Sequence, residues 1–148
     1  PDALEQAIRA IRAVAPTQPL TVLIVCGGDR DASKRPIMGR IAAELADRAI
    51  LTSDNPRSED PERILDDMHA DIPSQRADRT VRVVDREQAI HHAIRATSSD
   101  GLVLIAGKGH ETYQIIGDET RDFDDRQVAR AALDARLPEH PGTRTIAA

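Results

Sequence analysis

Glycine, proline and charged residues gather in three short segments whose composition suits ligand binding. The segments are GGDRDASKR at residues 27–35, SDNPR at residues 53–57 and GKGHE at residues 107–111. In the second segment a turn accounts for Asn55 and Pro56, because both residues favour turns, but it does not account for Arg57. A guanidinium held on a stiff turn suits a two-point grip on a carboxylate or phosphate. We therefore interpret Arg57 as a candidate anion-binding residue.

The three segments carry charges of both signs. Arg30 and Lys34 offer positive charge beside the start of a predicted helix, whose N-terminus favours anions. If the segments lie together, Arg30 and Arg57 could bind the carboxylate of a zwitterion while Glu111 binds its ammonium group. The alternative is that the glycines and charges form only solvated turns, and the residues alone leave both interpretations open.

Neither glycine-containing loop matches a common nucleotide-binding motif. The first lacks the GxGxxG pattern of dinucleotide sites. GKGHE is not a Walker loop, because Gly101 lies six rather than five positions before Gly107 and His110 stands where Ser or Thr is needed. Cys26 is the only cysteine, and no carboxylate–histidine spacing accompanies His110, so we expect no metal site. We also expect no catalytic residue in this chain, which lacks a P-loop. Ordinary surface positions are expected for the remaining histidines, His69, His91, His92 and His140.

The composition limits the classes of partner. The 148 residues carry 25 acidic and 20 basic side chains, a formal charge of −5, whereas nucleic-acid-binding domains are usually basic. One Tyr, one Phe and no Trp are too few aromatic residues for a platform that stacks single-stranded nucleic acid. No apolar run approaches the ~20 residues that span a membrane, and a lone cysteine without a signal peptide fits the reducing cytoplasm. We therefore expect a cytoplasmic protein without nucleic-acid or membrane partners.

Strand and helix signals alternate along the chain. Apolar runs rich in β-branched residues predict strands over 21–25, 49–52, 79–84 and 102–106, the last of them as the central strand. Amphipathic patterns predict helices over 1–14, 35–48, 59–72, 85–99 and 124–137, and TYQIIGD with ETRDF predicts a hairpin. A loop is expected over 73–78 and a loose tail over 138–148. The alternation predicts one α/β domain over residues 1–148: a Rossmann-like three-layer fold, mainly a parallel sheet of about six strands, with helices on both faces and an antiparallel edge hairpin.

The predicted fold also places the three segments. Ligands of parallel α/β sheets bind at the carboxyl ends of the strands. Each segment directly follows one predicted strand. We therefore expect all three at one edge of the sheet, where Arg30, Arg57 and Glu111 can act together.

Three longer stretches then carry a resemblance. GGDRDASKRPIMGRIA, TSDNPRSEDP and LIAGKGHETYQ, in this order and spacing, resemble the C-terminal domain of the Mur ligases. Within that family the match is to the UDP-N-acetylmuramoyl-tripeptide synthetases that add meso-diaminopimelate, and it covers the chain from PDALE to FDDR. DNPR is the diaminopimelate recognition motif of that group, and relatives that add lysine typically lack its Arg. Ser33 and Ser53 differ from the commoner Gly and Asp at two flanking positions, which affects loop shape rather than ligand class.

The resemblance implies a function for a longer enzyme. Such an enzyme is an ATP-dependent amide ligase of peptidoglycan synthesis, and so of cell-wall biogenesis, cell shape and cell division. It joins meso-diaminopimelate to UDP-N-acetylmuramoyl-L-alanyl-D-glutamate through an acyl phosphate, with Mg²⁺ stabilising the phosphate charge. In the family an N-terminal domain binds the UDP sugar and a central domain holds ATP and Mg²⁺; both are expected to be absent from this chain, which would then be inactive alone. We also expect a monomer.

The resemblance further implies roles for single residues. Arg30 and Arg57 would bind the substrate carboxylate, while the Gly107 carbonyl and Glu111 would bind its ammonium group. The other substrate-binding positions of the motif are Asp54, Asn55 and Pro56. Positions with roles that the resemblance does not assign are Lys34, Lys108 and His110, and a position bordering the nucleotide is Asp2.

Three alternatives remain at this point. The first is a ligase domain of the same fold for another amino acid such as L-lysine, against which Arg57 argues. The second is a free-standing small-molecule-binding α/β module. The third is a purely structural α/β domain, which the clustering of charged glycine loops at predicted strand ends disfavours.

Overall fold

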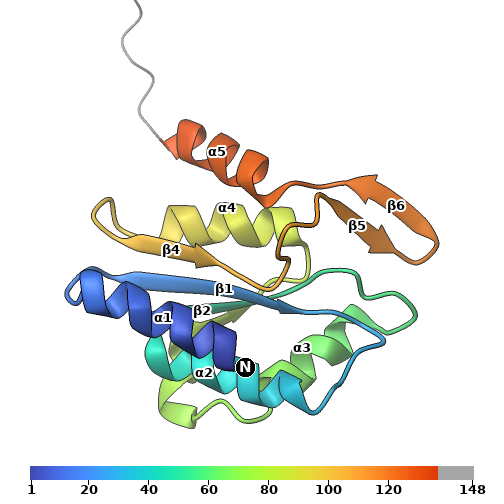
Figure 1. Ribbon diagram of the computed structural model, residues 1–148, viewed down its shortest axis with the longest axis horizontal. Coiled ribbons are helices and arrows are strands. Elements are labelled where there is room, and N and C mark those ends of the chain that lie inside the picture. Colours follow the sequence, from blue (N-terminus) through green and yellow to red (C-terminus); the bar gives the residue numbers. More distant parts are fainter. Residues whose placement is uncertain (137–148) are drawn as a thin grey trace, which may run out of the picture.

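The computed structural model describes residues 1–136 and shows a four-stranded parallel sheet between two helical layers (Figure 1). The strands are β1 (Leu20–Cys26), β2 (Arg48–Ser53), β3 (Thr80–Arg82) and β4 (Leu102–Ile105), in the spatial order β3-β2-β1-β4. All three pairings are parallel. The predicted three-layer α/β class is confirmed, whereas the predicted tail over 138–148, His140 and the last residue of the last predicted helix lie outside the described residues.

Two details of the predicted sheet are wrong. The parallel sheet has four strands rather than about six, because β5 (Tyr113–Ile116) and β6 (Glu119–Asp122) form a separate two-stranded antiparallel sheet. The strand expected at the centre, β4, lies at an edge, and β1 and β2 occupy the centre. The apolar character of β4 has another cause: Leu102 and Leu104 pack toward one helical layer, and Val103 and Ile105 toward the other.

Helices cover both faces of the sheet. One layer contains α1 (Asp2–Val14), α2 (Lys34–Leu45) and α3 (Pro61–His69), and the other contains α4 (Arg86–Ala96) and α5 (Asp125–Arg136) (Figure 1). Side chains alternate along each central strand, so that Val22 and Leu51 belong to the first core while Leu23 and Ile50 pack with Ile90 of α4. The sheet is thereby buried on both faces, as the continuous apolar runs predict.

Short polar residues fix the helix starts beside the strand-end loops. The Asp60 side chain accepts a hydrogen bond from the Glu62 backbone N–H and caps α3, and Asp85 accepts one from Gln88 and caps α4. These caps determine where the chain leaves each loop at the carboxyl edge of the sheet.

The segment over 73–78, expected to be a loop, is instead a 3₁₀ helix, η1 (Ser74–Arg79).

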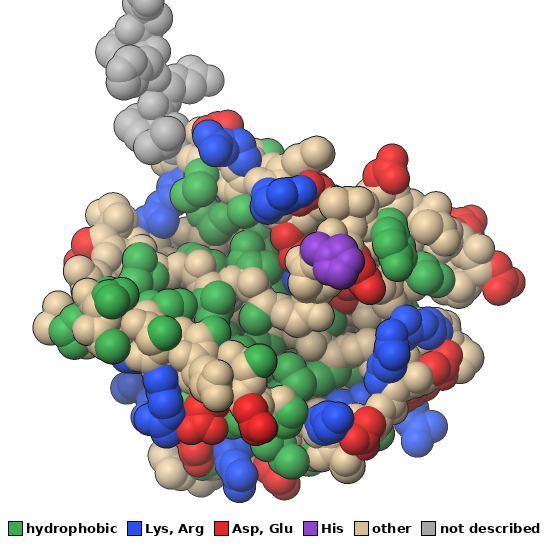
Figure 2. Space-filling view, viewed as in Figure 1, with side chains coloured by type: hydrophobic (Ala, Val, Ile, Leu, Met, Phe, Trp, Pro, Cys, Tyr) green, Lys and Arg blue, Asp and Glu red, His purple; other side chains and the backbone are tan. Residues whose placement is uncertain are grey.

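The surface mixes charges of both signs. On the face shown in Figure 2, Lys and Arg side chains are interspersed with Asp and Glu rather than gathered by sign. Among the described residues, every helix is too short or too polar to pass through a lipid bilayer.

Candidate functional site

The loops that follow β1, β2 and β4 meet at the carboxyl edge of the sheet and line a pocket of about 190 Å³. Its lining residues are Val25, Gly27, Arg30, Asp54, Asn55, Arg57, Gly107, Lys108 and Glu111. Six of the seven residues expected to bind substrate therefore come together, and the seventh, Pro56, is buried within the same turn without lining the pocket.

Of the three residues without an assigned role, only Lys108 lines the pocket. Lys34 is exposed at the start of α2 and lies 3.5 Å from Asp31. His110 is exposed and lines a neighbouring depression of about 300 Å³ beside the start of α5. Asp2 is exposed at the start of α1 and does not line the pocket.

Gly28 gives the first and second loops their close contact. A Cβ on Gly28 would lie 1.8 Å from the Pro56 carbonyl oxygen, and the Gly28 N–H donates to the Asn55 carbonyl at 3.1 Å. The absence of a side chain at Gly28 therefore allows the first loop to pack directly against the backbone of the second. Gly27 lines the pocket, as expected of a glycine at which the backbone can approach a ligand, whereas Val25 was missed because it reads as core strand.

The turn that carries Arg57 is held in an uncommon backbone conformation. Asn55 has φ +49° and Arg57 has φ +53°, in the left-handed region that few non-glycine residues adopt. Arg57 Nη1 donates to the Gly28 carbonyl at 2.6 Å, which fixes the guanidinium at the pocket wall. Backbone strain of this kind costs about 1–3 kcal/mol for each residue and persists only where the surroundings enforce it. The turn therefore holds Arg57 rigidly.

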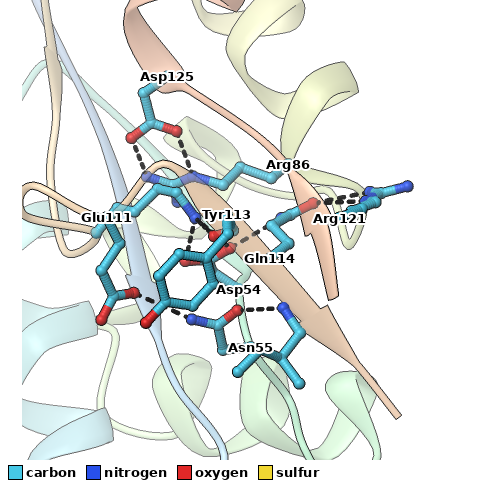
Figure 3. A network of polar contacts seen from close by, with 10 residues as sticks. Asp54, Asn55, Arg86, Glu111, Tyr113, Gln114, Arg121 and Asp125 are labelled. Carbon is cyan, nitrogen blue, oxygen red and sulfur yellow. Dashed lines mark hydrogen bonds and ion pairs between the residues drawn. The ribbon is translucent and has the colours of Figure 1, made fainter. Parts of the chain in front are cut away.

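Asn55 connects the second loop to Glu111. Its side-chain Nδ2 donates to Glu111 Oε2 at 3.1 Å, and its Oδ1 accepts from the Ile115 backbone N–H at 2.6 Å (Figure 3). Both ends of the amide are thereby used inside the protein. Asn55 orients the Glu111 carboxylate at the pocket and anchors strand β5 beside it.

Asp54 is held by neighbouring side chains. Lys108 Nζ lies 3.1 Å from each of its carboxylate oxygens, and Gln114 Nε2 donates to Oδ1 at 2.8 Å. Gln114 Oε1 in turn accepts two hydrogen bonds from Arg121 (Figure 3). A chain of polar contacts therefore links the pocket to the β5–β6 hairpin.

Arg35 supports the first loop from beneath. Its buried guanidinium makes two 2.8 Å hydrogen bonds to the Glu59 carboxylate, one of 2.9 Å to Asp67, and one of 3.2 Å to the Gly27 carbonyl. Glu59 also accepts from the Asp29 backbone N–H at 2.6 Å. The hydrogen bond from Arg35 lowers the pKa of Glu59 from 4.5 to about 2. This ion pair joins the start of α2 to the loops on both sides of the pocket.

The pair between Arg35 and Glu59 predicts an acid-dependent stability. Because the pKa of Glu59 is depressed in the folded state, its contribution is present above about pH 4.5 and is lost as the pH falls toward 2. We expect Glu59→Gln to lower the unfolding temperature at pH 7 and to reduce the loss between pH 5 and 2. Thermal unfolding across this range measures both effects, with the exposed Glu44→Gln as control. Parallel pH curves for wild type and Glu59→Gln would contradict this role.

The described residues offer neither a cluster of metal ligands nor a Walker loop. Among residues 1–136, no group of three or more His, Cys, Asp or Glu is placed to hold a metal ion. GKGHE lacks the Walker spacing, so it cannot cradle phosphates in that way. Burial raises the pKa of the Cys26 thiol to about 11, which makes it a poor nucleophile at neutral pH. The chemistry available to the pocket is charge recognition and orientation.

Most of this chain is similar in sequence to curated proteins that share one name. A UDP-N-acetylmuramoyl-L-alanyl-D-glutamate--2,6-diaminopimelate ligase of Geobacillus kaustophilus (strain HTA426) is 54% identical over 136 residues, which cover 92% of this chain and 27% of that protein. A protein of the same name from Trichormus variabilis (strain ATCC 29413 / PCC 7937) is 57% identical over 137 residues, with the same coverage. The chain thus spans about a quarter of the length of these curated relatives.

A solved structure and a family model agree with these relatives. The structure of a UDP-N-acetylmuramoyl-L-alanyl-D-glutamate--2,6-diaminopimelate ligase matches with a TM-score of 0.83 and 42% identity, over 91% of this chain and 27% of that one. Residues 1–109 match the model of the Mur ligase, glutamate ligase domain. The chain therefore belongs to the Mur ligase family, as its glutamate ligase domain.

Proposed function

We propose that this chain supplies the amino-acid-binding pocket of an ATP-dependent ligase that adds meso-diaminopimelate to UDP-N-acetylmuramoyl-L-alanyl-D-glutamate. The observation that carries the proposal is one pocket lined by Arg30, Arg57 and Glu111. Two guanidinium groups suit a carboxylate, and one carboxylate suits an ammonium group. The names of the curated relatives support diaminopimelate as the amino acid.

The charges of the pocket favour diaminopimelate over lysine. Diaminopimelate has a zwitterionic amino-acid group at each end, so one end can occupy the pocket while the amine of the other attacks. Lysine has only an ammonium group at its far end and would leave Arg57 without its carboxylate partner. An unmade charge-assisted hydrogen bond costs about 1–3 kcal/mol or more in a desolvated site. The pocket therefore rejects lysine by leaving its own charge unpaired.

In this proposal the chain positions the nucleophile. The UDP-linked substrate would supply the γ-carboxyl group of its D-glutamate residue, and ATP, held with Mg²⁺ mainly outside this chain, would activate it as an acyl phosphate from which the amine displaces phosphate. The pocket fixes the far end of diaminopimelate, and this presents the near amine to that carboxyl group. Orientation of this kind can account for about 7–11 kcal/mol of a reaction barrier.

A hybrid ligase tests the proposal. It is the Geobacillus kaustophilus relative with its matching segment, 27% of its length, replaced by this chain. We expect ADP release that depends on meso-diaminopimelate, with kcat/KM at least about a hundredfold above that for L-lysine. We expect this chain alone to form no product.

Three outcomes would contradict the proposal. Equal use of L-lysine would show that the pocket does not read the second carboxylate. A folded hybrid that binds ATP and the UDP substrate but accepts neither amino acid would show that the pocket is not the amino-acid site. Product formation by this chain alone would refute the division of tasks.

A further inference from the structure

We propose that Lys108 is a positioning residue that places Glu111 for the substrate ammonium group, an inference that rests on the proposed function. Its side chain is 2% exposed, and that of its partner Asp54 is 5% exposed. The sequence contains only one other lysine, Lys34, which is exposed and paired with Asp31. A buried lysine in a chain that otherwise uses arginine indicates a local requirement.

The contacts of Lys108 close a short loop around Glu111. Its ammonium group bonds to both carboxylate oxygens of Asp54 and to the backbone carbonyl of Tyr113. Glu111 lies between Lys108 and Tyr113 in the chain, so the bond to Tyr113 ties together the two ends of the segment that carries Glu111. Asn55, which follows Asp54 directly, holds the Glu111 carboxylate itself. Loss of Lys108 would therefore free the 108–113 segment that carries Glu111 and would also loosen the Asp54–Asn55 turn that holds its carboxylate.

Lys108 also sets the charge of the pocket. Asp54 and Glu111 both line it, and an unpaired Asp54 would compete with Glu111 for the ammonium group of the ligand. The pair between Lys108 and Asp54 neutralises one of these carboxylates and leaves Glu111 as the carboxylate for the ligand. Removing one partner of a buried pair is strongly unfavourable because it leaves an uncompensated charge, whereas removing both can be nearly neutral.

The shape of the site explains the choice of lysine. An ammonium group has three donors on a compact centre, and three acceptors surround it here, two from Asp54 and one from Tyr113. The Lys108 ammonium also lies 5.4 Å from the centroid of the Phe123 ring. A planar guanidinium would need more room in this enclosed position, so arginine is not an equivalent replacement.

The test uses kinetics of the hybrid ligase. We expect Lys108→Met to raise the KM for meso-diaminopimelate about tenfold to a hundredfold and to leave the KM for ATP within about twofold. Lys108→Met combined with Asp54→Asn removes both charges and is expected to recover about tenfold or more of the lost kcat/KM. Lys108→Arg keeps the charge but not the compact geometry, so its loss is expected to lie between those of the wild type and Lys108→Met.

Arg86→Met provides the matched control. Arg86 forms another buried ion pair, with Asp125 at 2.7 Å, and it does not line the pocket (Figure 3). It is expected to lower the unfolding temperature of the hybrid without changing the KM for meso-diaminopimelate. This separates a loss of stability from a loss of positioning.

Several outcomes would contradict a positioning role for Lys108. An unchanged KM for meso-diaminopimelate in Lys108→Met overturns the inference, and so do equal rises in both KM values. If Asp54→Asn fails to rescue Lys108→Met, an unpaired Asp54 charge is not what disturbs the site, and the inferred role of the pair is contradicted. If Lys108→Met does not fold, the double variant decides alone, because a loss greater than about a hundredfold there contradicts the inference. A wild-type hybrid that does not use diaminopimelate overturns the proposed function as well, which distinguishes the two failures.

Discussion

Replacing Arg57 with alanine in the hybrid ligase is expected to raise the KM for meso-diaminopimelate far more than the KM for ATP. Arg57 lines the pocket, and its guanidinium is held there by the Gly28 carbonyl at 2.6 Å. Losing a charge-assisted hydrogen bond to the substrate carboxylate costs about 1.5–3 kcal/mol, and 1.4 kcal/mol corresponds to a factor of about ten. Steady-state kinetics with each substrate varied in turn measures the effect.

Two further variants sharpen the Arg57 result. Arg57→Lys keeps the charge but loses the planar fork, so an intermediate loss is expected. Arg40→Ala removes an exposed arginine of α2 outside the pocket and is expected to change neither KM. Equal rises in both KM values for Arg57→Ala would mean that Arg57 maintains the fold instead of binding the amino acid.

Gly28→Ala is expected to be the most damaging single change near the pocket. Its new Cβ would lie 1.8 Å from the Pro56 carbonyl oxygen, and neither backbone can move without displacing Asn55 and Arg57. Overpacking of this kind costs about 1–3 kcal/mol of stability, and displacement of binding groups by about 1 Å can cost a hundredfold in activity. Thermal unfolding of this chain and kinetics of the hybrid measure the two effects.

The neighbouring glycine gives a matched control. A Cβ on Gly27 would lie no closer than 3.5 Å to any neighbouring heavy atom, which is ordinary van der Waals contact. Gly27→Ala is therefore expected to change the free energy of unfolding by less than about 0.5 kcal/mol. Equal destabilisation by the two substitutions would contradict the close packing of the Gly28 and Pro56 backbones.

Periodicity along the chain was sufficient to predict the layers and the edge of the sheet at which the three loops meet. The continuous apolar runs at 21–25 and 49–52 indicate strands buried on both faces, and the parallel order brings the loops after them to one edge. Strand order across the sheet depends on tertiary packing, so the edge position of β4 could not be read from its apolar residues. Alternating β-formers likewise predict a hairpin over 112–123 without indicating that it forms a sheet of its own.

Local sequence could not predict which charged side chains form ion pairs with one another. Lys34 and Lys108 both follow glycine-containing strand ends, yet only Lys108 enters the pocket. Its partner Asp54 lies 54 positions away, a pairing that exists only after β2 and β4 are placed on either side of β1. Composition was the signal that singled out Lys108. A lysine at a strand end in a chain whose other basic residues are nearly all arginine indicates a contact that requires an ammonium group.

A crystal structure of the hybrid ligase with meso-diaminopimelate would show directly whether this pocket holds the amino acid. We expect one amino-acid end of the ligand in the pocket, with its carboxylate about 3 Å from the Arg57 guanidinium and its ammonium group facing Glu111. We also expect the pair between Lys108 and Asp54 to persist beside the ligand. A ligand bound outside this pocket, or one whose ammonium group faces Arg57, would refute the proposed binding mode.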